Sequence, residues 1–254
     1  MKQYILEGCV DSVESAILAC RGGANRLELC SNLIIGGTTP SEWLFQEVKK
    51  YCNIKLHVLI RPRYGDFCYS EYEFNIMKEE VKRYRELGAE GIVLGILKAD
   101  GTLDKDRMAQ IIALANNMSI TLSRAFDVCA NPFDTMLQAK ELGIHTILTS
   151  GQENSCLKGK ELIAELHQRA VGEIDILVSG GVCSEVIKEI YQLTHVTSYH
   201  MSGKVIKESN MVYRKENVNM GLPSLSEYEI WQTDEQKIID AKEVLDKICS
   251  FKKS

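Results

Sequence analysis

Short apolar runs alternate with longer amphipathic stretches along nearly the whole chain. Alternation of this kind is typical of parallel strands joined by crossover helices. Eight such units in 254 residues predict an α/β protein with a single closed (β/α)8 TIM-like barrel. We expect it to span residues 1–254 as one domain, with its first strand pairing with the eighth. The predicted strands are residues 4–9, 26–30, 55–62, 91–95, 120–127, 146–151, 175–182 and 197–203.

Helix signals occupy the stretches between these runs. Ser70 and Glu73 form a capping-box pattern, and Asn131 precedes a proline at the first helical position. Gly88 and Gly143 each end a helical stretch directly before a buried run. An open doubly wound sheet is the alternative architecture, but the sequence has no GxGxxG turn of the kind such sheets often carry.

Residues 204–232, after the eighth strand, break this rhythm. The segment shows no clear helix–strand unit, although most connections in such folds are short. It carries Tyr213, Tyr228 and Trp231, which argue against simple disorder. We expect this long loop to fold over the barrel mouth or into a subunit interface.

The first two predicted strands end in the same pattern, Glu-x-Cys. Glu7 and Cys9 end the first strand, and Glu28 and Cys30 end the second. Residues two apart on a strand share a face, so adjacent strands would bring two carboxylates and two thiols together. Neighbouring carboxylates split their pKa values, which suits acid–base chemistry, while paired thiols suit Cu(I). The alternative for each cysteine is a small buried apolar residue.

Arginines and an aspartate follow the third and fifth strands. Arg61 and Arg124 could donate to the strand-end glutamates or to an anionic ligand, and Asp127 could orient or charge-balance an arginine. Active sites of these barrels lie where strands end, so we expect a catalytic mouth built from Glu7, Glu28, Arg61, Arg124 and Asp127. The alternative is a purely structural layer of salt bridges. His57 and His200, inside strands three and eight, are interpreted as core residues.

Small residues end the last three strands. Loops after strands seven and eight often hold phosphate in this fold, and glycine lets backbone N–H groups approach an anion closely. The predicted anion-binding residues are Ser150, Gly151, Gly180, Gly181, Ser202 and Gly203.

Composition narrows the possible partners. The net charge of −5 argues against a basic surface that would bind nucleic acid. No apolar run approaches the ~20 residues of a membrane span. Nine scattered cysteines without a CxxC pair, and an N-terminus that leads into a strand rather than a signal-peptide core, indicate reduced thiols in the cytoplasm.

Ten short runs between about residues 5 and 221 match motifs of one known family. They are residues 9–16, 21–24, 26–30, 36–41, 60–63, 65–67, 69–70, 124–127, 148–151 and 213–214. Taken together, they make the sequence resemble the CutC family of copper homeostasis proteins. The resemblance implies a cytoplasmic TIM-barrel-like protein that is linked to copper handling and usually forms an oligomer. The family pattern has a histidine before Arg-Ala-Phe-Asp, where this chain has Ser123.

Two functions therefore stay open. The first is copper homeostasis with Cu(I) held by Cys9 and Cys30. The second is an enzyme acting on a small anionic metabolite, phosphorylated or carboxylated, at the barrel mouth. Thiols that share an opening would favour copper, whereas thiols that face the helices beneath a ring of Glu7, Glu28, Arg61 and Arg124 would favour the enzyme. In both cases we expect a small-molecule or metal ligand and a homo-oligomer.

Overall fold

A computed structural model describes residues 4–222 and 224–251. Eight parallel strands form a closed barrel in sequence order, which confirms the predicted fold class. The barrel closes where β1 pairs with β8, and in this register Glu7 lies opposite both Arg26 and His200. The strands are β1 (Ile5–Val10), β2 (Arg26–Leu29), β3 (Lys55–Leu59), β4 (Gly91–Leu94), β5 (Ser119–Leu122), β6 (Thr146–Thr149), β7 (Asp175–Val178) and β8 (Ser198–Met201). The single-domain prediction also covers residues 1–3, 223 and 252–254, which lie outside the described residues.

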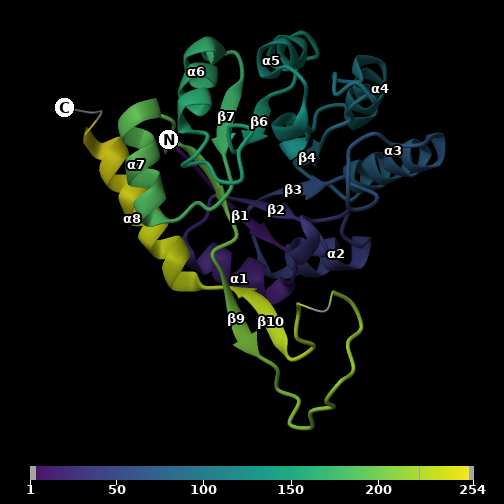
Figure 1. The fold of residues 1–254 in the computed structure, drawn as a ribbon, viewed down its shortest axis with the longest axis vertical. Coiled ribbons are helices and arrows are strands. Elements are labelled where there is room, and N and C mark those ends of the chain that lie inside the picture. The colour runs from purple at the N-terminus through teal and green to yellow at the C-terminus, as the bar shows by residue number, and fades with distance from the viewer. Residues whose placement is uncertain (1–3, 223, 252–254) are drawn as a thin grey trace.

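Helices surround the barrel (Figure 1). The predicted caps form: Ser70 and Glu73 make a complete capping box, and the Asn131 side chain accepts hydrogen bonds from the first turn that follows it. The helices are α1 (Val13–Gly22), α2 (Glu42–Tyr51), α3 (Glu71–Glu86), α4 (Lys105–Ala115), α5 (Pro132–Glu141), α6 (Lys160–Ala170), α7 (Ser184–Thr194) and α8 (Glu235–Phe251), with short 3-10 helices η1 (Leu33–Ile35) and η2 (Arg124–Val128).

The fifth strand is shorter than predicted. It ends at Leu122, and the residues that follow form η2 instead of extending to Asp127. Ser123 causes the change, because its hydroxyl accepts a hydrogen bond from Ala125 N and caps the new turn. Arg124 and Asp127 consequently lie three residues apart on one 3-10 turn and form an ion pair.

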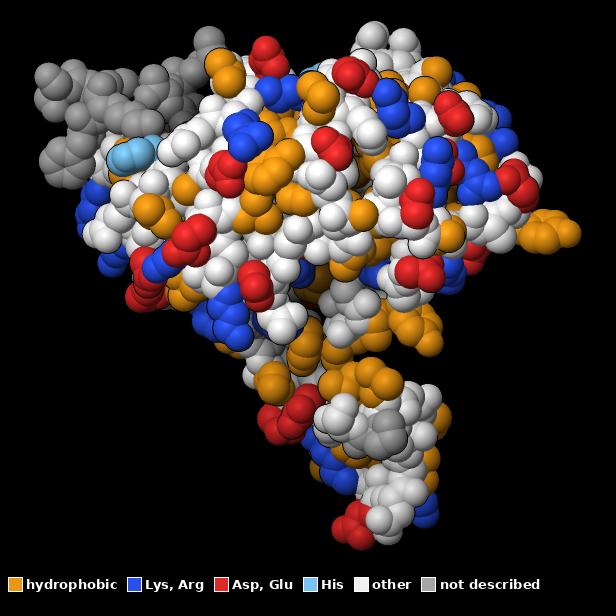
Figure 2. Space-filling view, turned by 45° about the horizontal axis from the view of Figure 1, so that its top comes forward, with side chains coloured by type: hydrophobic (Ala, Val, Ile, Leu, Met, Phe, Trp, Pro, Cys, Tyr) orange, Lys and Arg blue, Asp and Glu red, His pale blue; other side chains and the backbone are white. Residues whose placement is uncertain are grey.

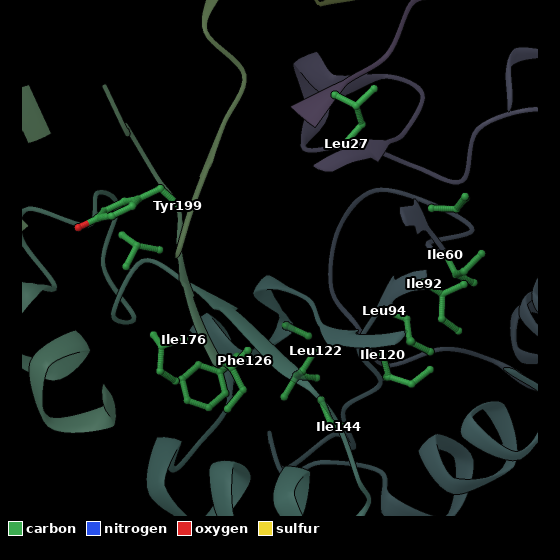
Figure 3. Close-up of a cluster of buried hydrophobic side chains, with 14 of the residues drawn as sticks. Leu27, Ile60, Ile92, Leu94, Ile120, Leu122, Phe126, Ile144, Ile176 and Tyr199 are labelled. Carbon is green, nitrogen blue, oxygen red and sulfur yellow. The ribbon is translucent and has the colours of Figure 1, made fainter. Parts of the chain in front are cut away.

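Apolar side chains form two separate layers. The larger layer lies between the strands and the helices, and Figure 3 shows part of it, including Ile120, Leu122 and Ile176. The smaller layer consists of side chains that alternate with the first set along the strands and therefore fill the barrel lumen. This lumen cluster contains Cys9, Cys30, Leu59, Val93, Leu148 and Leu177.

Residues 204–222 and 224–233 form an arm that projects from the barrel (Figure 1). Its base is an antiparallel pair, β9 (Lys204–Glu208) and β10 (Glu229–Thr233), which the sequence pattern did not predict. Of the described arm residues, only Lys204 lines the barrel mouth, so the arm does not cover that opening. Figure 2 shows apolar side chains on its surface. Among the arm residues, Val212 and Met220 are 95% and 81% exposed. A role in a subunit interface stays a prediction.

A backbone contact joins the end of β6 to the start of α6. Gly151 has a φ of +74°, and a Cβ built there would lie 2.2 Å from the carbonyl oxygen of Gly159. Glycine is therefore required at position 151 both by its left-handed conformation and by the absence of space. This contact explains Gly151 without any ligand.

We expect Gly151→Ala to lower the free energy of unfolding by about 2–5 kcal/mol, because left-handed strain and a backbone collision act together. Gly143→Ala is the matched control, since its φ is +72° but no atom lies within 4 Å of the built Cβ. That variant should lose only about 1–2 kcal/mol from strain. Denaturant unfolding of both variants measures the difference, and equal losses would contradict the packing explanation.

Candidate functional site

A cavity of about 440 Å³ opens at the C-terminal ends of the strands. Three of its lining residues come from the adjacent strands where the barrel closes. They are Cys9 from β1, Glu28 from β2 and His200 from β8. Arg61, Arg124 and other polar and apolar groups complete it. The remaining lining residues are Leu33, Gly36, Leu59, Phe67, Val93, Ser123, Leu148, Ser179, Gly180, Gly181, Val182, Met201, Ser202 and Lys204.

Cys9, Glu28 and His200 form a compact group of potential metal ligands. One ligand atom from each lies within 4.8 Å of the others. The Cys9 Sγ is 3.9 Å from Glu28 Oε1, and His200 Nδ1 is 3.9 Å from Glu28 Oε2. Thiolate and imidazole are ligands that soft and borderline transition metals prefer. A single ion of that kind could contact two or three of these groups at once.

Glu7 lies in the lumen next to this group and is not among the residues that line the cavity. Its side chain is fully buried, forms an ion pair with Arg26 and is 2.7 Å from His200 Nδ1. Burial alone would raise the pKa of Glu7, but the charges of Arg26 and His200 outweigh burial and lower the pKa to about 2. Glu7 is therefore ionised at neutral pH and holds the His200 ring by one nitrogen.

The cavity groups retain protons more readily than they would in water. Burial is the main cause that raises the pKa of Glu28 to about 7, and nearby Glu7 adds to it. The Cys30 thiol, burial and the two glutamates raise the pKa of Cys9 well above its usual range. Burial opposes protonation of His200, but Glu28 and Glu7 raise its pKa overall.

Cys30 directly follows β2 and is less accessible than Cys9. It is fully buried, its Sγ is 3.6 Å from the Val10 carbonyl oxygen, and its thiol interacts with that of Cys9. Both sulfurs belong to the lumen cluster rather than to the layer under the helices. The thiols thus share the interior of the barrel, but only Cys9 lines the cavity.

Arg61 contacts backbone carbonyls, not the carboxylates expected from the sequence. Its Nη1 donates to the carbonyl oxygens of Gly36 and Gly37, both at 3.0 Å, and its Nη2 donates to that of Gly65 at 2.7 Å. The guanidinium also lies over the Phe67 ring. Arg61 therefore ties the loops after β2 and β3 to the cavity wall.

Arg124 pairs with Asp127 instead of with a strand-end glutamate, and Asp127 thus balances an arginine as the sequence analysis allowed. Arg124 Nε is 2.6 Å from Asp127 Oδ2, and the carboxylate also accepts hydrogen bonds from Thr149 and from the backbone and hydroxyl of Ser150. Asp127 is thus fully occupied and does not line the cavity, whereas 44% of the Arg124 side chain is exposed. Asp127 orients the arginine that reaches the mouth.

The six predicted anion-binding residues divide into two groups. Gly180, Gly181 and Ser202 line the cavity, whereas Ser150, Gly151 and Gly203 do not. The Ser150 hydroxyl is engaged by Arg124, Asp127 and a backbone carbonyl.

Two cavity residues escaped the sequence analysis as site residues. His200 was interpreted as a core residue, yet barrel closure places it directly opposite Glu7. The predicted pairing of the first and eighth strands could have indicated that His200 lies beside Glu7. Ser179 carried no signal of its own, but its buried hydroxyl lacks a hydrogen-bond partner within the described residues.

Comparison with known proteins adds to this geometry. The model of the CutC family matches residues 4–205. The chain belongs to the CutC family. Its relatives include proteins from human and mouse named as copper homeostasis protein cutC homologs, each 40% identical over 236 residues and 92% of this chain, covering 86% and 87% of those proteins. A CutC family protein from Parabacteroides distasonis is 43% identical over 236 residues, 92% of this chain and 97% of its own length.

Solved structures agree with this assignment. A crystal structure of a CutC protein from Streptococcus agalactiae matches this CutC-family barrel with a TM-score of 0.75 and 31% identity, covering 79% of this chain and 99% of the other. Thiamine phosphate pyrophosphorylase from Pyrococcus furiosus matches with a TM-score of 0.57 at 15% identity, covering 97% and 98% of the two chains, which shows the shared fold alone. Among residues 4–222 and 224–251, no helix has the length and apolar character that crossing a bilayer requires.

The raised pKa of Glu28 predicts a stability that depends on pH. Between about pH 4.5 and 7 the folded protein holds a proton that the unfolded chain has lost, so stability falls as pH rises through this interval. Since one pKa unit corresponds to about 1.4 kcal/mol, Glu28→Gln should be more stable than wild type by at least about 1 kcal/mol at pH 8, with a smaller gain at pH 5. Denaturant unfolding at both pH values tests this, with exposed Glu86→Gln as the control. A difference between Glu28→Gln and wild type that does not depend on pH would contradict it.

Proposed function

We propose that this CutC-family protein binds copper as Cu(I) at the barrel mouth and serves copper homeostasis in the cytoplasm. One observation carries the proposal: a thiol, an imidazole and a carboxylate from three adjacent strands lie within 4.8 Å of one another at the cavity wall. Family relatives named as copper homeostasis proteins support the choice of metal. Cu(I) prefers the sulfur and imidazole of this group over the carboxylate.

Cys9 and His200 are the principal ligands in this proposal. Glu7 accepts the hydrogen bond of the His200 Nδ1–H, so Nε2 is the nitrogen that would bind the metal, which displaces any proton on it. A carboxylate that holds a metal-binding histidine in this way fixes its tautomer and strengthens it as a ligand. Arg26 in turn keeps Glu7 ionised. The buried ion pair thus supports the metal site without contacting the ion.

Cys30 supplies a second sulfur next to Cys9. Because the pKa of Cys9 is high, the thiol keeps its proton until a metal displaces it. Copper binding would therefore release protons, and the affinity should rise with pH. Glu28, with its own raised pKa, is placed to accept a proton from Cys9 at 3.9 Å.

We expect Cys9→Ser and His200→Gln each to weaken Cu(I) binding by at least about tenfold, since each removes a direct ligand. A competition titration against a chromophoric Cu(I) chelator, under anaerobic reducing conditions, measures the affinity. Cys30→Ser in the same assay tests the second sulfur.

Cys68→Ser is the matched control for the cysteine variants, because Cys68 is an exposed free thiol that does not line the cavity. It should bind Cu(I) as wild type does. If both Cys9→Ser and His200→Gln bind Cu(I) with wild-type affinity, the proposal that copper binds at this site is wrong.

A second candidate function is acid–base catalysis on a small anionic metabolite, phosphorylated or carboxylated, in the same cavity. It is favoured by the exposed Arg124 guanidinium and by the Ser179 hydroxyl, which has no hydrogen-bond partner in the described part of the chain. Both residues line the same cavity as Gly180 and Gly181. Such groups suit the binding of an oxyanion. The pKa of Glu28, near 7, suits proton exchange with that ligand.

For this second candidate, Arg124→Gln should weaken the binding of inorganic phosphate at the mouth by about tenfold, because a charge-assisted contact is lost. Backbone amide NMR shifts of residues 179–182 during a phosphate titration report on this site. Lys82→Gln, on the outer face of α3, is the control. Amides 179–182 that do not respond to phosphate in the wild type would exclude anion binding at the mouth.

A further inference from the structure

A second cavity, of about 520 Å³, lies at the opposite end of the barrel. It is formed where β2, β3 and β5 begin and by the connections that precede β4 and β5. Neither the copper proposal nor the metabolite proposal uses it. Its chemically active lining residues are Arg26, Lys55, His57, Arg85, Glu90 and Asn116.

Two of these residues carry buried polar atoms without a partner. Arg26 is 7% exposed, and its Nε is bonded to Glu7, but its Nη2 has no hydrogen-bond partner within the described residues. His57 is 2% exposed, and its Nδ1 is unpartnered in the same way. Leaving a buried polar group unsatisfied is costly, and for a charged group more so. A ligand in the cavity that accepts hydrogen bonds would remove this cost.

The His57 side chain occupies space that is left free by Gly91, its register partner on β4. A Cβ at Gly91 would lie only 2.6 Å from His57 Nε2, so glycine is what lets the imidazole occupy this place. The glycine at position 91 thus leaves room in the lumen for the imidazole of His57.

The charges around the cavity are unbalanced. Arg26, Lys55 and Arg85 are cationic, whereas Glu90 is the one carboxylate among the lining residues. Both Glu90 oxygens are already engaged, one by Leu56 N at 2.9 Å and the other by Lys49 Nζ at 3.2 Å. Lys55 has no ion pair within the described residues, and Arg85 donates one hydrogen bond, to Leu114 O at 2.7 Å. Unused cationic donors therefore converge on this space.

We propose that the cavity at the N-terminal face binds a small oxyanion group, a phosphate or a carboxylate. Arg85 and Lys55 would hold it at the rim, and Arg26 Nη2 would contact it from below. Guanidinium groups suit such oxyanions because they offer parallel N–H donors. The proposal does not depend on the mouth or on copper.

A titration of the full-length protein with inorganic phosphate, followed by backbone amide NMR at low ionic strength, tests it. Amides 115–119 report on this cavity, and amides 179–182 report on the mouth. We expect saturable shifts at 115–119 in the wild type. Lys55→Gln and Arg85→Gln should each weaken the binding measured there by about tenfold.

Lys82→Gln and Arg83→Gln are controls on the same helix as Arg85, because both residues form surface ion pairs outside the cavity. They and Arg124→Gln should bind phosphate at amides 115–119 as wild type does. A parallel titration with acetate distinguishes the ligands, and saturation by acetate alone would assign the site to carboxylates. The proposal is overturned if neither ion gives saturable shifts at 115–119, or if Lys55→Gln and Arg85→Gln bind as wild type does.

Discussion

The carboxylate of Glu7, with no exposed surface, is the constraint on which the barrel interior depends. An isolated charge in a protein interior costs several kcal/mol, so the fold must place compensating groups around it. Arg26 and His200 fill this role, and they are its register partners on the two adjacent strands. Strand register, barrel closure and charge compensation are therefore one requirement.

This requirement makes the lumen polar at two levels. Toward the mouth, Glu7 holds His200, which brings an imidazole beside Cys9 and Glu28. Toward the other end, Glu7 holds Arg26 by its Nε, while the Arg26 Nη2 has no hydrogen-bond partner among the described residues. One carboxylate thus positions a soft ligand set on one side and a cationic group on the other.

The sequence was sufficient for the architecture because each barrel unit carries its own local signals. The Ser70 capping box and the Asn131 cap start their helices as predicted. Strand ends were less predictable, because the cap made by Ser123 depends on one hydroxyl and turns 124–128 into a 3-10 helix. The arm strands escaped prediction because β9 reads Lys-Val-Ile-Lys-Glu, which lacks the alternation of apolar and polar residues typical of a strand, and its side chains stay largely exposed.

The side-chain partners in the candidate site could be predicted only in part. Glu28, Arg61 and Arg124 do line the mouth cavity, but Arg61 satisfies carbonyl oxygens and Arg124 pairs with Asp127. Strand-end position tells which residues share a face of the barrel, whereas the partner of a long side chain depends on loop geometry. His200 required combining two predictions, the closure of β8 on β1 and the charge of Glu7.

The distance along the chain between Glu7 and His200 has a consequence for synthesis. The two residues are separated by 193 positions, so the imidazole leaves the ribosome only after nearly all of the barrel. Until β8 docks, one side of the lumen is open and water can solvate the Glu7 carboxylate. Closure removes that water only when the last strand supplies His200. A truncated chain that lacks β8 therefore has both an open sheet edge and a charge that it cannot bury, two features by which cellular quality control can distinguish it from the finished protein.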